Sequence, residues 1–189
     1  AGAMAVGGSI AIAAVSPTVN AYIGGAGKTI RAAELEVRAR RILPVTGNSA
    51  DASASGSSGG LIGVVGTVSN AQTNGTVQAY AGQNSTLNIS GTALIRASVD
   101  SAQRSVADGN AYGLVAVGGN SAIASSSTVI DAYLADGVIA NGGAFTIQTG
   151  GTEYNLADAS AGSGGVIAGS AAVAVTTNNT TSTASIKAG

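Results

Sequence analysis

The stretch Thr18-Val19-Asn20-Ala21-Tyr22-Ile23 decides the fold of this chain, because similar stretches recur at nearly constant distances. Their equivalent alanines are Ala21, Ala79, Ala132 and Ala184, which are 58, 53 and 52 residues apart. An apolar run rich in valine, isoleucine, glycine and alanine begins fifteen residues before each of these alanines. Self-similarity at such a period is typical of repeat proteins, in which each unit buries its apolar face by stacking on the next. We therefore expect the function to reside in a surface rather than in a pocket.

The repeats divide the chain into three complete units and one partial unit. We place them at approximately 6–63, 64–116, 117–168 and 169–189. A further marker, an alanine-aspartate pair followed by small residues, accompanies each complete unit at 50–51, 107–108 and 157–158. Because no charged or proline-rich tract interrupts the phase, we expect residues 1–189 to form a single elongated body without linkers.

Segment 33–40 gives the clearest secondary-structure signal. Small apolar residues alternate there with Glu34, Glu36, Arg38 and Arg40. A period of two predicts a strand with an apolar inner face and a charged outer face. A helix is the competing interpretation, since Glu34 and Arg38 are four residues apart. The strand is favoured because segments 95–100 and 145–149 alternate in the same way.

Short groups of turn-forming residues recur along the chain. They predict strands of about 4–8 residues without helices between them. Glycine and asparagine adopt the positive φ angles that sharp corners need. The predicted corners are at 24–25, 47–48, 59–60, 74–75, 108–109, 141–143, 150–151 and 164–165. This pattern favours an all-β parallel β-helix, and an immunoglobulin-like sandwich is the alternative. At two or three coils per unit, the chain would form about seven to ten rungs and a rod of roughly 35–45 Å.

Composition excludes several classes of protein. Only 9% of the residues are charged and the net charge is −1, so the concentrated basic surface needed to bind nucleic acid is not expected. The chain has no cysteine, which excludes disulfides and thiolate metal sites. The apolar run 3–15 is shorter than a membrane span and recurs inside the chain, so we interpret it as a repeat element and not as a targeting signal.

The amino-acid sequence of the first repeat resembles the repeats of very large secreted bacterial filamentous adhesins, of the haemagglutinin-like and leukotoxin-like kinds. The resemblance is carried by 18–24, 35–39, 50–54 and 59–66 and extends over essentially the whole chain. It implies a right-handed parallel β-helix that forms a stalk at a cell surface, without catalytic residues. The basic residues from Arg38 to Arg41 depart from the pattern, because later repeats lack them. Both ends of the sequence fall inside a unit, which leads us to expect either a piece of a longer array or a subunit that stacks end to end.

Catalysis is not expected from these residues. The chain has no histidine, so it cannot form a Ser-His-Asp triad or a histidine zinc site. A polysaccharide lyase would need a cluster of acidic residues with a basic partner. Lys28, Arg31, Arg38, Arg40 and Arg41 do lie near Glu34 and Glu36 in the sequence, but alternating charges on a strand are typical of a solvated face. We predict no enzyme activity and no cofactor.

Two sets of residues are the candidate sites. Asp51, Asp108 and Asp158 would form a column able to bind calcium if they are aligned, although turn capping by each side chain is the favoured interpretation. Tyr22, Tyr80 and Tyr133 are predicted to project from one outer face, where aromatic rings can stack on sugars. With two or three coils per unit they would lie about 10–14 Å apart and would not stack on each other.

The sequence thus favours a structural or adhesive segment of a bacterial extracellular filament or surface stalk. The expected partners are neighbouring repeats, other copies placed end to end, and glycans of a host or cell surface. A self-assembling fibre subunit and a carbohydrate-binding or ice-binding β-helix are the alternatives. The threonine-rich tail 176–183 suggests ice binding, but its threonine spacing does not recur in the other units.

Overall fold

The computed structural model describes residues 3–45 and 47–188, which form strands and contain no helix. The strands are β1 (Met4–Val15), β2 (Thr18–Ile23), β3 (Thr29–Ala32), β4 (Leu35–Arg41), β5 (Ala50–Gly59), β6 (Ile62–Ala81), β7 (Thr86–Tyr112), β8 (Val115–Leu134), β9 (Ile139–Gly164), β10 (Ile167–Asn178) and β11 (Thr181–Ile186). The predicted all-β class is confirmed. The predicted strand length is wrong, because β7 has 27 residues and β9 has 26.

The strands form two sheets in which every pairing is parallel. Sheet A contains β1, β6, β8 and β10 in that order, with β2 beside β6 and β11 beside β8. Sheet B is centred on β7, which pairs with β3, β4, β5 and β9. The repeat phase is confirmed by the register, since Ala79 pairs with Ala21 and Ala132, and Ala132 pairs with Ala184.

Each repeat makes one layer, which runs along sheet A and returns along sheet B. Hydrogen bonds between layers continue through the corners, where Gly60 N donates to Tyr112 O at 3.2 Å and Gly113 N donates to Gly164 O at 3.0 Å. The expectation of two or three coils per repeat is therefore wrong, and so is that of about seven to ten rungs. The 20 residues of β6 extend over about 66 Å, whereas the four main strands of sheet A lie within about 14 Å. The described body is longest along its strands and not along the stack.

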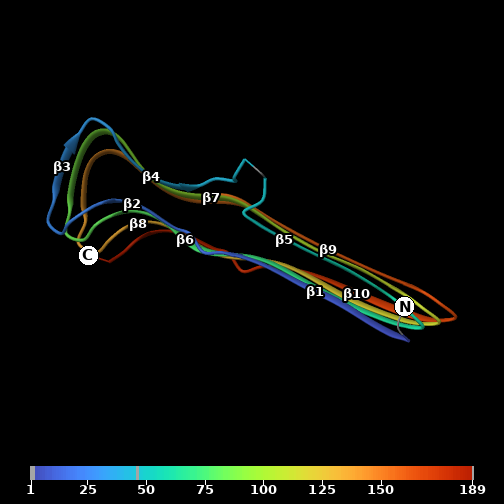
Figure 1. The fold of residues 1–189 in the computed structure, drawn as a ribbon. Coiled ribbons are helices and arrows are strands. Elements are labelled where there is room, and N and C mark those ends of the chain that lie inside the picture. Colours follow the sequence, from blue (N-terminus) through green and yellow to red (C-terminus); the bar gives the residue numbers. More distant parts are fainter. Residues whose placement is uncertain (1–2, 46, 189) are drawn as a thin grey trace.

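The two sheets diverge at one end of the body and converge at the other (Figure 1). At the wide end the chain passes from β2 through β3 to β4 and encloses a three-sided space. At the narrow end β1 and β10 of sheet A lie close to β5 and β9 of sheet B. This difference in separation decides which side chains fit between the sheets.

Left-handed residues recur at one corner of the wide end. Gly27, Asn84 and Gly137 have φ angles of 71°, 55° and 70° in successive repeats. Glycine adopts this conformation without strain, and asparagine is among the residues that tolerate it best. Other glycine-containing pairs that predicted corners lie inside long strands, which explains the overestimated number of coils. These are 74–75 in β6, 108–109 in β7 and 150–151 in β9.

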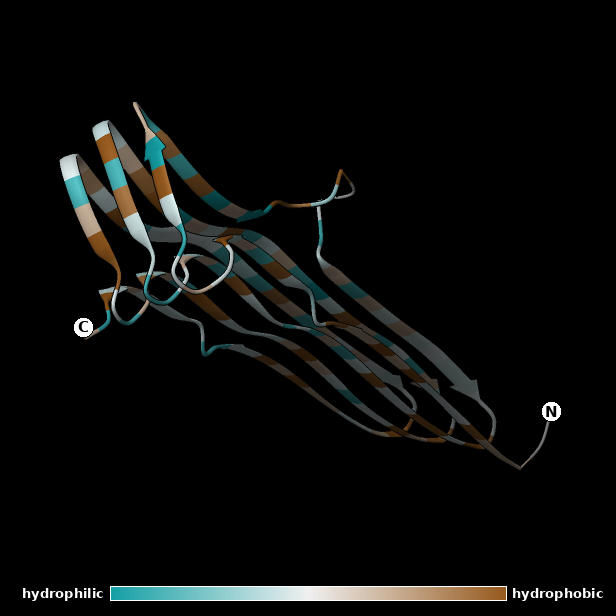
Figure 2. Ribbon diagram, turned by 90° about the vertical axis from the view of Figure 1, so that its left-hand side faces the viewer, coloured by the Kyte–Doolittle hydropathy of each residue, from teal (hydrophilic) through white to brown (hydrophobic). Residues whose placement is uncertain are grey.

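The main apolar core fills the wide end. Valine, isoleucine, leucine and alanine from three sides meet there, with Val77, Leu87, Ile95 and Val99 at most 1% exposed. The ribbon alternates between apolar and polar bands along these strands (Figure 2), which confirms the predicted inner faces of the tyrosine segments and of 95–100. In segment 33–40 the alternation holds within β4, whereas Ala33 and Glu34 precede that strand.

The narrow end has an interior of small and hydroxyl-bearing side chains. Ser69 Oγ donates to the Ala52 carbonyl at 2.8 Å and accepts from Ser105 Oγ at 2.9 Å. Thr67 Oγ1 donates to Asn120 Oδ1 at 2.7 Å. The apolar inner face that alternation predicts does not extend to this end, because closely spaced sheets favour small residues and a buried hydroxyl must find a partner.

Within residues 3–45 and 47–188, only the first repeat has an additional segment, which lies between its strands β4 and β5. Arg41 pairs with Val99 at an offset of 58 residues, whereas Ala50 pairs with Gln103 at an offset of 53. The five additional residues belong to the segment between Arg41 and Ala50, where Ile42 and Val45 are 60% and 108% exposed. This segment accounts for the longer first period of the sequence.

Candidate functional site

The three predicted tyrosines form a continuous stack on the outer face of sheet A. The ring centroids of Tyr22 and Tyr80 are 5.2 Å apart and those of Tyr80 and Tyr133 are 4.9 Å apart, with interplanar angles of 8° and 1°. The outward orientation is confirmed, but the expected spacing of about 10–14 Å is wrong, because one repeat contributes one layer. The tyrosines stack on each other, so the inner ring faces are not available to a sugar.

Lys187 covers the last ring of this stack. Its Nζ lies 4.1 Å from the centroid of Tyr133, a cation–π contact. Burial raises the pKa of the Tyr133 hydroxyl, and the charges of Tyr80 and Asp131 raise it further. The hydroxyl therefore remains protonated at neutral pH and acts as a hydrogen-bond donor or acceptor rather than as a base. At the other end of the stack, Tyr22 is 58% exposed.

The three aspartates do not form a column. Asp51 pairs with Arg104, Asp108 pairs with Ser55 and Ser160, and Asp158 pairs with Val106. Their register positions differ along the strands, so the alanine-aspartate pairs of the three units are not aligned in space. Among the described residues no group of three histidine, cysteine, aspartate or glutamate side chains could hold a metal ion. The calcium column is thus contradicted by the register.

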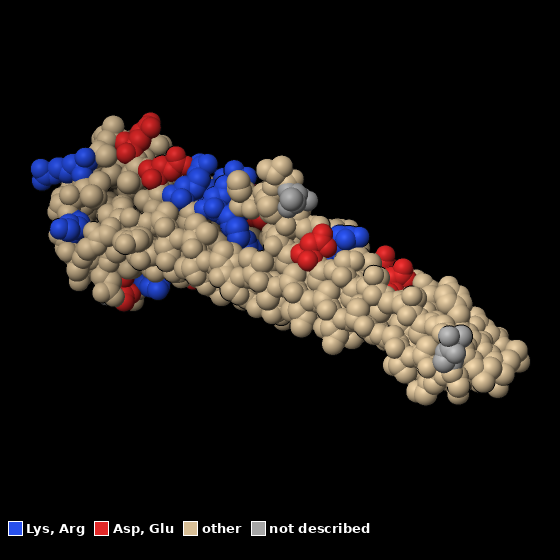
Figure 3. Space-filling model, in the orientation of Figure 1, with Lys and Arg blue, Asp and Glu red and all other residues tan. Residues whose placement is uncertain are grey.

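The charged residues concentrate over β3, β4 and β7, whereas the narrow end is nearly free of charge (Figure 3). Arg38 and Arg96 are register partners on neighbouring strands, and Arg40 lies two residues further along the same face. We call the space that they border with Ser98, Asp100 and Thr152 the arginine hollow, and its volume is about 360 Å³. Arg38 forms an ion pair with Glu36, and Arg40 pairs with Asp100 at 3.3 Å. Among the described residues, no carboxylate pairs with Arg96.

An apolar hollow adjoins the arginine hollow. It has a volume of about 520 Å³ and is lined by Ile42, Leu43, Ala102 and Tyr154, together with three residues shared by both hollows. The shared residues are Arg40, Asp100 and Thr152. Tyr154 is 61% exposed. The sequence patterns did not indicate this site, because its two walls come from different repeats and from the excursion of the first repeat.

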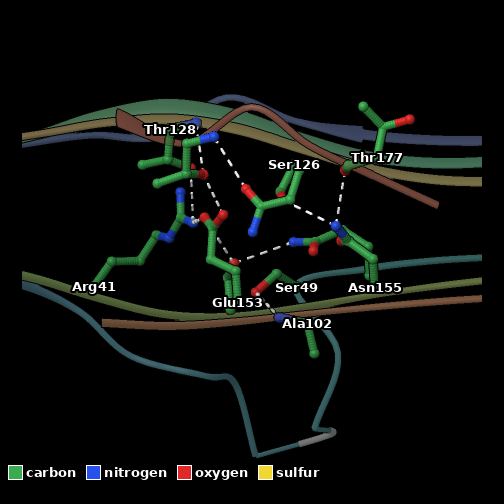
Figure 4. A network of polar contacts seen from close by, with 12 residues as sticks. Arg41, Ser49, Ala102, Ser126, Thr128, Glu153, Asn155 and Thr177 are labelled. Carbon is green, nitrogen blue, oxygen red and sulfur yellow. Dashed lines mark hydrogen bonds and ion pairs between the residues drawn. The ribbon is translucent and has the colours of Figure 1, made fainter. Parts of the chain in front are cut away.

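Arg41 forms a buried ion pair instead of lying on the predicted basic outer face. Its Nη2 lies 3.5 Å from Glu153 Oε1 and 3.3 Å from Thr128 Oγ1, and the two charged side chains are 9% and 5% exposed. The close view shows both side chains between the sheets (Figure 4). Since Arg41 belongs to the first repeat and Glu153 to the third, the pair crosses the layer of the second. Extending the alternation of segment 33–40 by one residue would have predicted that Arg41 points inward.

Arg41 and Glu153 differ in the hydrogen bonds that they make besides their ion pair. Glu153 also accepts hydrogen bonds from Ser101 Oγ at 3.3 Å and from Thr180 Oγ1. Arg41 Nε and Nη1 are buried without a hydrogen-bond partner. Burial lowers the pKa of Arg41, and the nearby Glu153 carboxylate opposes this effect. The guanidinium nevertheless remains charged at neutral pH.

The outer face of sheet A at the narrow end is aliphatic. We call it the aliphatic face and define it by the outward positions of β1, β6, β8 and β10, which are Met4, Val6, Gly8, Ile10, Ile12, Ile62, Val64, Gly66, Val68, Asn70, Val115, Val117, Gly119, Ser121, Ile123, Ile167, Gly169, Ala171, Val173 and Val175. None of them is charged. Ile10, Ile12 and Val117 are 74%, 69% and 50% exposed. The recurring apolar run of the sequence thus directs most of its larger side chains to solvent, with Val65 as an inward exception.

Comparisons with family models, with curated proteins and with solved structures give no match to this chain. Within residues 3–45 and 47–188, no helix has the length and apolar character required to cross a membrane.

Proposed function

We propose that this chain is a non-catalytic structural segment of a secreted bacterial filament or cell-surface stalk, built as a right-handed parallel β-solenoid. The observation that carries the proposal is the register, because every strand of one repeat pairs in parallel with the equivalent strand of the next. Repeats of this kind stabilise one another through contacts with their neighbours. The partners are further repeats of the same kind, in the same chain or in other copies placed end to end.

A pair of internal deletions tests this stacking. Removal of residues 69–121 joins Val68 to Ala122, the register partner of Ser69, and therefore keeps every later side chain on its own face. Removal of 69–120 leaves one additional residue and exchanges the two faces of the strand. We expect the first deletion to retain a β-sheet circular dichroism spectrum and cooperative unfolding. In small-angle scattering it should lose about 4.8 Å of thickness without losing length.

The second deletion is the matched control, and we expect it to be unfolded or aggregated. Equal behaviour of the two deletions would contradict the stacked-repeat structure. A shortening along the strands instead of across the stack would contradict it as well.

We propose, as a second function, that the two adjoining hollows bind acidic oligosaccharides. Arg38 and Arg96 present like charges side by side, an arrangement that costs stability unless an anion lies between them. Guanidinium groups bind sulfate and carboxylate with paired hydrogen bonds, and Ser98 and Thr152 add hydroxyl groups at the same hollow. Tyr154 then offers an exposed ring to the apolar face of a neighbouring sugar.

Calorimetric titration tests this binding with three hexasaccharides: one derived from heparin, an oligogalacturonate and a neutral cello-oligosaccharide. We expect the acidic sugars to bind and the neutral sugar not to bind. Arg96→Ala should weaken binding about tenfold, as expected from the loss of a charged hydrogen bond. Arg104→Ala is the control, since Arg104, like Arg96, is partly exposed but pairs with Asp51 away from the hollows. Equal losses in both variants, or equal binding of single-stranded DNA, would contradict a specific sugar site.

A further inference from the structure

The aliphatic face is a contiguous and uniform apolar surface, unlike the scattered apolar residues of an ordinary exposed surface. Its twenty positions form five columns across four strands, and only Asn70 and Ser121 carry polar side chains. Nine residues along a strand and four strands across correspond to about 500 Å². Monomeric proteins rarely expose contiguous apolar patches beyond a few hundred Å², and larger ones mark interaction sites. The face is therefore expected to have a partner.

The surface shape of the aliphatic face is complementary to itself. The middle column consists of Gly8, Gly66, Gly119 and Ala171, so it forms a shallow lane across the strands. The flanking columns are mostly valine and isoleucine: one holds Val6, Val64 and Val117 with Gly169, and the other holds Ile10, Val68 and Val173 with Ser121. An aliphatic column of one molecule can enter the lane of another, as facing sheets interdigitate. A second copy also has the same spacing of about 4.8 Å between layers, so its columns match along the stack.

The charge and the area of the aliphatic face also indicate that its partner is a second copy of this chain. A face without charged residues offers nothing to an ionic partner, because a charge placed against it would lose its hydration without compensation. Two such faces together would bury about 1,000 Å², which lies at the lower limit for a specific interface. The contact is thus expected to be weak for the four strands described here and to strengthen as repeats are added, because each layer contributes a further row of contacts.

We infer that the aliphatic face is a lateral interface that pairs with the same face of a second copy of this chain, sheet against sheet. This inference deepens the proposed structural role and rests on it for its biological setting. It differs from end-to-end stacking, which would use the edges of β1 and β10 and leave the face open. Lateral pairing would join two stacks side by side.

Cysteine cross-linking tests the geometry, because the chain has no cysteine of its own. Gly119→Cys places a single thiol in the glycine lane, where an added Cβ would have no atom within 4 Å. Thr18→Cys places the same thiol at an exposed position of β2 in the same sheet, outside the face. The lane of one copy faces a flanking column of the other, so the two thiols lie near each other but not in direct contact, and we expect a short bismaleimide to give cross-linked dimers of the first variant at least tenfold faster than of the second. Equal rates would overturn the inference.

Sedimentation velocity tests the association without a cross-link. The unmodified chain should show a reversible monomer–dimer equilibrium, and Val117→Lys should weaken it at least tenfold, because the lysine lies in the centre of the contact. Thr18→Lys, the charge-matched control, should dimerise like the unmodified chain. A monomer at all concentrations, or equal dimerisation of both lysine variants, would overturn the inference. So would sedimentation of the chain with phosphatidylcholine vesicles in place of dimerisation, since that result assigns the face to a lipid surface. None of these results alters the outcome of the deletion experiment.

Discussion

The buried pair of Arg41 and Glu153 should be the most sensitive point of the structure, and the two partners should differ in their importance. At 3.5 Å the attraction between the charges is about 5 kcal/mol at an effective dielectric constant of 20. The cost of burying both groups is of similar size, so the intact pair adds little net stability. Removal of one partner, in contrast, leaves the other charge buried and uncompensated.

The other hydrogen bonds of Arg41 and Glu153 predict which of the two substitutions lowers the free energy of unfolding more. In Glu153→Gln the guanidinium of Arg41 keeps its hydrogen bond to Thr128 Oγ1, but it loses the only carboxylate that pairs with it among the described residues. Its Nε and Nη1 already lack partners. We expect this variant to lose about 3–5 kcal/mol of unfolding free energy. In Arg41→Leu the carboxylate keeps the hydroxyl donors of Ser101 and Thr180, so the expected loss is smaller, about 2 kcal/mol.

Urea denaturation followed by far-ultraviolet circular dichroism measures these losses, and the double variant Arg41→Leu/Glu153→Gln completes a thermodynamic cycle. Since the double variant has no unpaired charge, it should be more stable than Glu153→Gln alone. Asp100→Asn is the control, because it breaks the exposed pair with Arg40 and should cost at most about 1 kcal/mol. Additive losses in the double variant, or a loss from Glu153→Gln no larger than that of the control, would refute the reasoning.

Three further outcomes are expected. Tyr80→Ala removes the middle ring and both of its stacking contacts, so urea denaturation should show about twice the loss of Tyr22→Ala, each contact contributing about 0.5–1.5 kcal/mol. Because folding raises the pKa of Tyr133, its protonated hydroxyl contributes stability below pH 10, and this contribution is lost as the pH rises further. Above pH 10 the urea denaturation midpoint of Tyr133→Phe should therefore fall less steeply with pH than that of the unmodified chain. Gly142→Ala should lower the thermal midpoint strongly, since its φ is +119° and an added Cβ would lie 1.8 Å from a backbone oxygen, whereas Gly119→Ala, with open space around it, should not.

The period of the repeat and the inner faces of the wide end could be read from the sequence. The alanine spacing of 58, 53 and 52 residues agrees with the observed registers around Ala79 and Ala132. Period-two alternation also placed the tyrosines outside, because alternation is a local property of any strand. These features depend on neighbouring residues alone.

The number of layers could not be read in the same way. A pair such as 108–109 is equally compatible with a corner and with the interior of a long strand, and here it lies within β7. Corner formation depends on whether the neighbouring layers turn at the same place, which is a property of the stack. The misjudged corners led directly to the wrong spacing of the tyrosines and to the expected rod. The aspartate marker failed for a different reason, because Asp51 is aligned with Arg104 and Asp158 with Val106, so the aspartates occupy different register positions.

The sequence by itself determined that this chain is a stack of parallel β repeats with a period of 52–58 residues. Only the tertiary structure decided what the repeated apolar run does. Where the sheets diverge, large aliphatic side chains fill the space between them. Where they converge, the interior holds alanine, serine and threonine side chains together with Val65 and Asn120, and Ile10 and Val117 face solvent. The separation of the two sheets is set by contacts between residues far apart in the chain, so no local pattern could reveal which face of the run would be buried.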